Sequence, residues 1–533
     1  MQHKFLFINS LLPAIGLTFV SAMDKKVRVR FAPSPTGGLH LGGVRTVLYN
    51  YLFARANGGD FVLRIEDTDQ NRFVAGAEDY IMNCLEWCGL VPDESPAKGG
   101  PYAPYRQSER KHLYYNYAQK LVDAGHAYYA FDTTEDLERM RKDLKKDEHS
   151  VPQYDHTTRM LMRNSLSLSN EEVMKLLEQS TPYVIRIKMP NHETITLTDM
   201  IRGEISFDSS LVDDKVLLKA DGMPTYHLAV VVDDYLMKIT HAFRGEEWLP
   251  SAPVHVLLWQ YLGWKEHMPL WAHLPLILKP DGNGKLSKRD GDRLGFPVFA
   301  MNWTDPRTNE TTKGFREMGF LPQAFVNMLA MLGWNSGSEQ EIFSLDELVS
   351  RFSIDRVHKG GAKFDFEKAK WFNHQYIQRT DNATLTGLVM PYIDEQQGPG
   401  KVTPELLEQV IGLVKDRCTL LPDFWAQGHF FFATPETIDI AAIKEKWNAP
   451  KQDFFTEWKN VLENLPEWNH DAIEASCNEY VGKHGLKKGD VMLPLRIMLV
   501  GGKYGPGVYA IAEVIGKNET IKRIGSVLKT LGA

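Results

Sequence analysis

The sequence reads Phe31-Ala32-Pro33-Ser34-Pro35-Thr36-Gly37-Gly38-Leu39-His40-Leu41-Gly42-Gly43 between an apolar run at residues 27–31 and an amphipathic run at residues 40–56. These flanks predict a strand, a proline- and glycine-rich turn, and a helix. Such a turn directs backbone N–H groups and a helix N-terminus at one point, which is how many folds bind nucleotide phosphate. The stretch lacks the G-x-G-x-x-G pattern of dinucleotide sites. It offers His40 instead, whose imidazole can donate to phosphate charge that develops in a transition state.

A second motif lies about 245 residues after His40, where the chain reads Lys285-Leu286-Ser287-Lys288-Arg289 after a glycine-rich lead-in. Two lysines three residues apart on a mobile loop can fold over phosphates. The strings between the two motifs are Arg64-Ile65-Glu66-Asp67-Thr68-Asp69, Gly100-Pro101-Tyr102, Tyr105-Arg106-Gln107-Ser108-Glu109-Arg110, Pro224-Thr225-Tyr226-His227-Leu228-Ala229 and Arg244-Gly245-Glu246-Glu247-Trp248.

Taken together, these strings resemble the HIGH and KMSKS signatures of class I aminoacyl-tRNA synthetases, in the version carried by bacterial glutamyl-tRNA synthetases. The resemblance runs from about Lys25 to the C-terminus. It implies an α/β fold, with a Rossmann-like parallel sheet split by an acceptor-stem-binding insertion, then a connecting domain and an all-helical anticodon-binding region. It also implies ATP-dependent activation of L-glutamate and its transfer to tRNA(Glu).

The position of Arg30 in its strand gives an independent indication of a ligand site. Arg30 alternates with Phe31 and faces the carboxyl end of its strand, where α/β sheets bind ligands. A guanidinium there suits a carboxylate. By resemblance, Arg30 and Tyr226 hold the γ-carboxylate of glutamate, Arg244 its α-carboxylate and Glu66 its ammonium group. Ala32 and Ser34 complete that pocket.

The resemblance implies further roles. Catalytic roles fall to His40, Gly42, Lys285, Ser287 and Lys288. ATP contacts fall to Pro33, Thr36, Gly37, His40, Gly42, Gly43, Glu247, Trp248, Ile277 and Lys288. tRNA contacts fall to Asp69 and Arg417. Mg²⁺ would accompany ATP, held by its phosphates.

Composition narrows the possibilities. The 533 residues are 43% hydrophobic and 24% charged, with a net charge of −7, so a tRNA partner requires locally basic surface. One candidate is residues 481–533, with nine Lys and Arg against three Asp and Glu. The four cysteines (Cys84, Cys88, Cys418 and Cys477) form no C-x-x-C pair, which predicts free thiols, no disulfide frame and no zinc.

Together with the pattern along the chain, the resemblance implies seven segments. They are a dispensable extension at 1–22, a first catalytic half at 23–106, the insertion at 107–212, a second catalytic half at 213–264, a stem-contact domain at 265–380, and helical domains at 381–445 and 446–533. Within them, we expect strands at residues 223–234 and 239–243, and a polar surface insertion at 297–314.

Residues 1–22 resemble a short signal peptide, with Lys4 before an apolar run. The charged residues 23–26, however, lead directly into the first strand, as a native start would. We therefore expect a cytoplasmic protein, with no membrane partner, that works as a monomer.

Several alternatives remain open. A glutaminyl-tRNA synthetase usually builds its anticodon region from β-barrels, whereas this one has helical periodicity. The tRNA-modifying glutamyl-queuosine relative lacks anticodon domains, so the presence of residues 381–533 argues against it. A small-molecule nucleotidyltransferase would share the superfamily site but would not require the helical residues from 381 onward. A catalytically silent tRNA-binding paralogue is the last option, although His40, Lys285, Lys288 and Arg30 are all present. The enzyme could also charge tRNA(Gln), although Arg417 favours one that discriminates.

Overall fold

The computed structural model describes residues 26–145, 147 and 152–531, so the expectation for residues 1–22 lies outside the described residues. The chain divides into two compact units. The first takes in the described residues up to Thr312 and Val326–Phe364, and the second takes in Lys313–Phe325 and the described residues from Asp365 onward.

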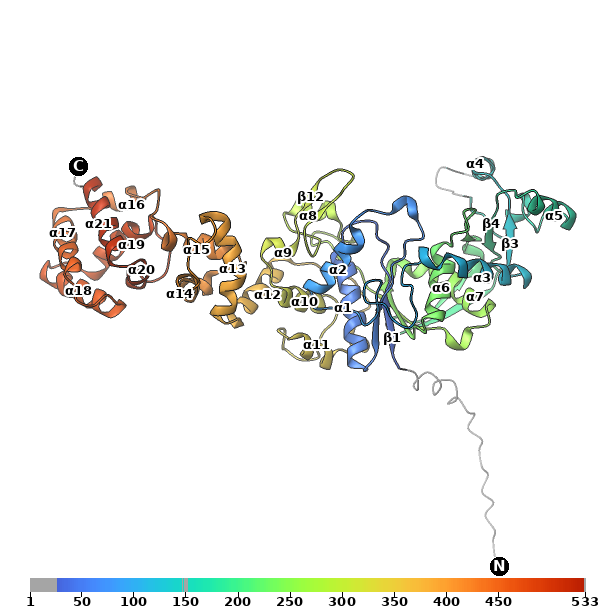
Figure 1. The fold of residues 1–533 in the computed structure, drawn as a ribbon, viewed down its shortest axis with the longest axis horizontal. Helices are drawn as coiled ribbons and strands as arrows, with labels where there is room; N and C mark the ends of the chain where they lie inside the picture. Colours follow the sequence, from blue (N-terminus) through green and yellow to red (C-terminus); the bar gives the residue numbers. More distant parts are fainter. Residues whose placement is uncertain (1–25, 146, 148–151, 532–533) are drawn as a thin grey trace, which may run out of the picture. The chain divides into compact units, whose positions relative to one another are not determined.

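A six-stranded sheet organises the first unit (Figure 1). Its strand order is β2-β1-β8-β9-β5-β6, and every neighbouring pair is parallel except β5 and β6. The strands are β1 (Arg28–Phe31), β2 (Asp60–Leu63), β5 (Thr194–Asp199), β6 (Gly203–Asp208), β8 (His241–Gly245) and β9 (Leu270–Leu274). The parallel sheet expected from the sequence is confirmed.

Smaller sheets surround this one. An antiparallel sheet joins β3 (Ala127–Ala130), β4 (Val184–Ile187) and β7 (Val216–Leu218). Two-stranded pairs join β10 (Ile277–Leu278) to β13 (Ala362–Lys363) and β11 (Trp303–Thr304) to β12 (Thr311–Thr312). The strands β5 and β6, which lie within the expected insertion at 107–212, extend the main sheet.

The helices of the first unit are α1 (Leu41–Ala56), α2 (Ala77–Trp87), α3 (Lys111–Asp123), α4 (Thr134–Asp143), α5 (Asn170–Glu178), α6 (Tyr226–Leu236), α7 (Ala252–Tyr261), α8 (Lys288–Leu294) and α11 (Leu345–Arg351). Short 3₁₀ turns include Ser108–Arg110 and Glu246–Ser251. Figure 1 shows α1 and α6 on opposite sides of β1, as expected for a sheet with helices on both faces.

One expectation was wrong. Residues 223–234 do not form a strand, because Tyr226–Leu236 is the helix α6. The run Val230-Val231-Val232 is buried in the cluster that α6 shares with α3 and α7. Burial on several sides, rather than sheet pairing, explains why this stretch is so apolar and β-branched, and tertiary context overrode the local β-propensity.

The expected polar insertion at 297–314 is also only partly at the surface. Val298, Phe299 and Trp303 are buried, whereas Asn302 and most of residues 304–312 are exposed. A side chain at Gly38 would place its Cβ 2.8 Å from Cγ of Trp303, so glycine is required for this close approach. The segment therefore supports the turn that precedes His40.

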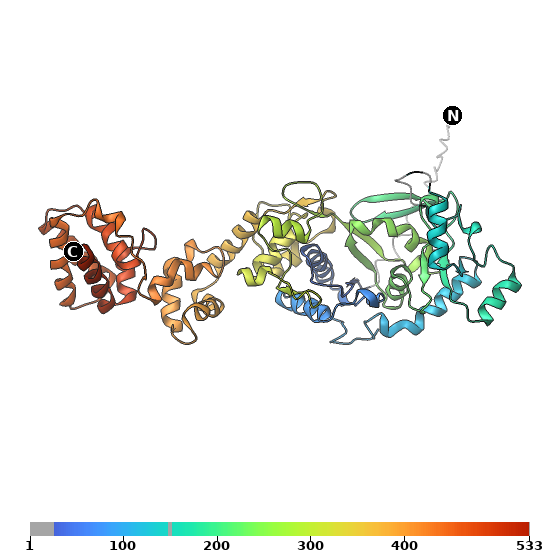
Figure 2. The same cartoon turned by 90° about the horizontal axis from the view of Figure 1, so that it is seen from above.

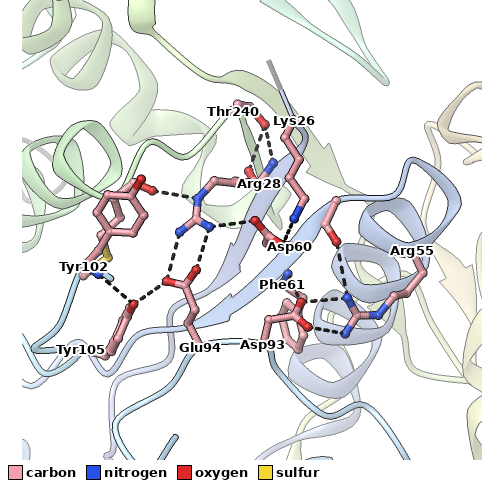
Figure 3. A network of polar contacts seen from close by, with 12 residues as sticks. Lys26, Arg28, Arg55, Asp60, Phe61, Asp93, Glu94, Tyr102, Tyr105 and Thr240 are labelled. Atoms are coloured by element: carbon pink, nitrogen blue, oxygen red, sulfur yellow. Dashed lines mark hydrogen bonds and ion pairs between the residues drawn. The ribbon is translucent and has the colours of Figure 1, made fainter. Parts of the chain in front are cut away.

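A polar network fastens the amino end of the sheet (Figure 3). Both Nη atoms of Arg28 bind the carboxylate of Glu94, at 2.7 and 3.1 Å, and Glu94 also accepts from the hydroxyl of Tyr105. Arg55 pairs with Asp93, which accepts from the backbone N–H of Phe61 at 2.8 Å. These bonds join β1, β2, α1 and the loop that follows α2.

The second unit is helical, with no strand among its described residues (Figure 2). Its helices are α9 (Phe315–Met318), α12 (Phe366–Arg379), α13 (Asn382–Gln397), α14 (Pro404–Val414), α15 (Asp423–Phe432), α16 (Ala441–Lys444), α17 (Ala449–Glu463), α18 (His470–Lys483), α19 (Lys488–Val500), α20 (Val508–Ile515) and α21 (Lys517–Leu531). The helix α10 (Pro322–Met331) begins in this unit and ends in the first. The helical periodicity read after residue 381 is confirmed.

All four cysteines are free and buried, as expected. Across the part of the chain that the structure describes, no helix is both long enough and apolar enough to cross a membrane.

The fully buried carboxylate of Asp233 in α6 accepts hydrogen bonds from three side chains at the start of α3 and in the segment before it. It accepts from Gln107 Nε2 at 3.0 Å, Arg110 Nε at 2.8 Å and the hydroxyl of Tyr114 at 2.8 Å. Removing this carboxylate leaves the buried guanidinium of Arg110 without its ionic partner. We predict that Asp233→Ala lowers the free energy of unfolding by about 3–5 kcal/mol, measured by urea denaturation.

The matched control is Glu109→Ala, which breaks the exposed ion pair with Arg106 next to Arg110. Exposed pairs contribute little, so this variant should lose less than about 1 kcal/mol. Equal losses in the two variants would contradict the importance of Asp233.

Candidate active site

A cavity of about 970 Å³ opens at the carboxyl ends of β1 and β8. Ligands bind at this edge of open α/β sheets. Most of the residues singled out from the sequence line it, namely Arg30, Ala32, Pro33, Ser34, Thr36, His40, Gly42, Gly43, Glu66, Asp69, Tyr226, Arg244, Glu247, Trp248, Ile277, Lys285 and Ser287. Gly37 and Lys288 do not line it, and Arg417 belongs to the second unit.

His40 is the N-cap of α1. Its Nδ1 accepts from the backbone N–H of Gly42 at 3.4 Å, so the ring proton resides on Nε2. That Nε2 is buried and has no partner among the described residues. Burial, and then the charge of Lys285, lower the pKa of His40 to about 4. At neutral pH the site therefore contains a neutral imidazole with an unused N–H donor.

The lysine loop contacts the opposite side of this cavity. Nζ of Lys285 lies 2.6 Å from Oε1 of Glu247. Ser287 is the N-cap of α8 and exchanges hydrogen bonds with Asp290. Lys288 is the first residue of α8 and is exposed.

Arg30 and Arg64 share a buried carboxylate. Arg30 Nε lies 3.2 Å and Arg64 Nη1 lies 2.8 Å from Oδ1 of Asp234, while Arg64 Nη2 binds Glu66 at 3.0 Å. Burial opposes ionisation, yet the two guanidinium groups lower the pKa of Asp234. This cluster of two cations and two anions is neutral overall.

Arg244 has a different environment. Its Nε donates to His273 at 3.0 Å, and its Nη1 donates to the hydroxyl of Tyr226 at 3.0 Å and to Nδ1 of His255 at 3.1 Å. Its Nη2 is buried without a partner among the described residues. The hydroxyl of Tyr226, which the sequence grouped with Arg30, is the oxygen that accepts the bond from Nη1 of Arg244.

Reasoning from the sequence missed Arg64, Asp234, His255 and His273. Two adjacent acids, Asp233 and Asp234, directly follow three valines, and that pattern could have suggested buried carboxylates. No local signal marks His255 or His273, because only the fold brings them to Arg244.

The expected tRNA-contacting groups are largely exposed. Asp69 lines the cavity and pairs with Arg72 at 3.0 Å. Arg417 lies in a 3₁₀ turn with its side chain 41% exposed. Of the basic residues in the C-terminal tract, Lys483, Lys488, Lys522 and Arg523 pair with glutamates, so the basic character of this tract is partly cancelled.

Comparison with known proteins agrees with this geometry. Residues 26–371 match the family described as tRNA synthetases class I (E and Q), catalytic domain, and residues 384–528 match the family described as anticodon binding domain. The chain therefore belongs to the class I tRNA synthetases of the E and Q type.

Curated relatives match over nearly their whole length. A glutamate–tRNA ligase of Cytophaga hutchinsonii is 52% identical over 513 residues, covering 96% of this chain and 99% of the relative. One from Phocaeicola vulgatus is 52% identical over 510 residues, covering 95% and 99%. A crystal structure of a glutamate tRNA ligase from Elizabethkingia meningosepticum in complex with its amino acid superimposes with a TM-score of 0.91 at 51% identity, covering 95% of this chain and 100% of that one.

The unused Nε2–H of His40 generates a kinetic prediction. Loss of one donor that acts on transition-state charge typically costs about 10²–10³-fold in rate. We expect His40→Ala to lower kcat of amino-acid activation by that factor, with the thermal unfolding midpoint unchanged.

His241→Ala is the control, because His241 lies on β8 but does not line the cavity. If His40→Ala instead raised KM for ATP without changing kcat, His40 would be a ground-state binding residue.

Proposed function

We propose that this protein is a glutamate–tRNA ligase. It would form glutamyl-adenylate and pyrophosphate from glutamate and ATP, and then transfer the glutamyl group to the 2′-hydroxyl of the terminal adenosine of tRNA(Glu). The observation that carries the proposal is a buried cation, Arg244, that has no carboxylate partner among the described residues and shares one cavity with His40 and Lys285. The names of the relatives support the same reaction.

The charges suggest how glutamate would be held. Glu66 is the anion suited to the ammonium group, and it binds Arg64, which shares the carboxylate of Asp234 with Arg30. Since the ammonium and the α-carboxylate share one carbon atom, we assign Arg30 to the α-carboxylate. Arg244, whose partners are neutral, is then available for the γ-carboxylate. This exchanges the roles that the sequence suggested for the two arginines. Ala32, Ser34 and Tyr226 complete this subsite.

ATP would occupy the remainder of the cavity, along Pro33, Thr36, Gly42, Gly43, Trp248 and Ile277. The α-carboxylate of glutamate attacks the α-phosphorus of ATP. The bond between the α-phosphorus and the oxygen that bridges to the β-phosphate breaks, and pyrophosphate leaves with that electron pair. His40 donates from Nε2 to the phosphate oxygens as charge develops. Lys285 would exchange Glu247 for phosphate, which frees Glu247 for the ribose, and Lys288 would approach by movement of the loop.

Mg²⁺ would enter with ATP and neutralise phosphate charge. Within residues 26–145, 147 and 152–531, no group of three His, Cys, Asp or Glu side chains could hold a metal ion, so its protein ligands would be few. Zinc independence stays a prediction. We also propose that the enzyme acts in the cytoplasm, where tRNA and ATP are available, and that it is a monomer.

Charging of purified tRNA transcripts tests the proposed reaction. With tRNA(Glu) and ATP, radiolabelled glutamate should be esterified and glutamine should not. Equal charging with the two amino acids would contradict the proposal.

The choice of tRNA is a separate question. Arg417 can make paired hydrogen bonds to a base edge, whereas glutamine offers a different pattern of donors and acceptors. If the enzyme discriminates against tRNA(Gln), as Arg417 suggests, Arg417→Gln should bring the ratio of kcat/KM for tRNA(Glu) and tRNA(Gln) toward one.

The control is Arg379→Gln, which removes another exposed arginine from the same unit. An unchanged ratio in Arg417→Gln would show that Arg417 is a surface residue. Equal charging of both tRNAs by the unaltered protein would identify the alternative, a non-discriminating enzyme.

A further inference from the structure

We propose that His273 and Asp199 are positioning residues for Arg244, which hold its guanidinium so that Nη2 faces the carboxylate of the substrate. The inference rests on the proposed function and extends it to residues that do not line the cavity.

The three side chains form one line of hydrogen bonds. Arg244 Nε donates to Nε2 of His273 at 3.0 Å, and Nδ1 of His273 lies 2.6 Å from Oδ2 of Asp199. They come from three neighbouring strands, β8, β9 and β5. None is more than 7% exposed. Such buried bonds are little screened by water, so their geometry constrains the guanidinium strongly.

The donor pattern fixes the tautomer of His273. A guanidinium has no acceptor, so Nε2 of His273 must offer a lone pair and its proton must reside on Nδ1, facing Asp199. Asp199 is itself held by the backbone N–H groups of Ile201 and Arg202, each at 2.9 Å. Burial opposes ionisation of Asp199, but these bonds and the one from His273 lower its pKa. The carboxylate therefore sets both the orientation and the protonation of the imidazole.

A second imidazole acts on the other edge of Arg244. Nδ1 of His255 accepts from Nη1, so the proton of His255 resides on Nε2, which lies 3.2 Å from Nδ1 of His227. Together with the hydroxyl of Tyr226, the imidazoles occupy Nε and Nη1 and leave Nη2 free. The free donor is the one that remains for a ligand.

Neutral partners also explain why Arg244 can discriminate by charge. Arg30 and Arg64 each contact a carboxylate directly, which cancels much of their attraction for another anion. At Arg244, the imidazole of His273 separates the guanidinium from Asp199. The position is thus fixed by hydrogen bonds while the positive charge stays available.

Asp199→Asn tests this arrangement. The amide oxygen can keep the bonds from Ile201 and Arg202, while the amide N–H₂ faces Nδ1 of His273 and gives up the bond that Oδ2 accepts from the backbone N–H of His273 at 3.0 Å. That reversal favours the other tautomer, which directs Nε2–H against the N–H of Arg244. We expect KM for glutamate in tRNA charging to rise tenfold or more, with KM for ATP changed by less than twofold, as for loss of a group that orients a ligand-binding residue.

Asp214→Asn is the matched control, since Asp214 is also fully buried and accepts from Tyr128 and from the backbone of Met189, but does not line the cavity. It should change stability without a selective effect on KM for glutamate. A purely structural role for Asp199 predicts that the two variants behave alike, and that result would overturn the inference.

Two variants of His273 test the inference independently, through their KM for glutamate. In His273→Gln, the amide oxygen can accept from Arg244 and the amide nitrogen can donate to Asp199, so KM for glutamate should recover toward that of the unaltered protein. His273→Leu can do neither and should raise it. Equal KM values in the two would contradict the inference. If the unaltered protein charged no glutamate at all, the proposed function itself would fail, and the inference with it.

Discussion

The carboxylate of Asp234 lies between two buried guanidinium groups and joins α6 to strands β1 and β2. Arg30 comes from β1, and Arg64 follows β2 and extends the contact to Glu66. Removing one member of a buried ion pair leaves an uncompensated charge, which is far costlier than the net gain of the pair. The floor of the cavity therefore depends on α6 being a helix at this place. Asp233, one residue earlier, fastens the same helix to the segment at Gln107–Tyr114.

Because Arg30 and Arg64 pair with buried carboxylates, the positive charge available to a ligand comes from other residues. Within the described part of the chain, Arg244 donates to neutral acceptors, and Lys285 pairs with the exposed Glu247, a contact that water and phosphate can displace. A fixed cation such as Arg244 and an exchangeable cation such as Lys285 suit a site that must select a carboxylate and then stabilise a polyphosphate; Arg45, Arg72 and Lys219 line the same cavity. Preorganised charge of this kind is the main means by which phosphoryl-transfer sites work.

The two phosphate-binding motifs and the helical character of the C-terminal region could be predicted from the sequence, for physical reasons. The turn around His40 and the loop around Lys285 are contiguous strings, so their chemistry is visible without a fold, and the helical period after residue 381 is local. The strand expected at 223–234 failed because a buried helix and a buried strand can both be valine-rich. His273 and Asp199 could not be found, because their role arises from the order of β8, β9 and β5 in the sheet. His273 and Asp199 lie 29 and 45 residues from Arg244 in the sequence, and nothing at those spacings indicates that the three side chains meet.

The central claim is that the uncancelled charge of Arg244 selects the γ-carboxylate of glutamate. It is tested most directly by kcat/KM for glutamate and for glutamine, in tRNA charging, with the unaltered protein and with Arg244→Gln. Loss of a buried charge partner typically costs 2–5 kcal/mol or more. The account predicts that the variant loses glutamate charging by at least about 30-fold, while the low activity with glutamine changes much less, so that the preference for glutamate collapses. An equal loss for both amino acids, with the preference intact, would instead assign Arg244 to the α-carboxylate and contradict the account.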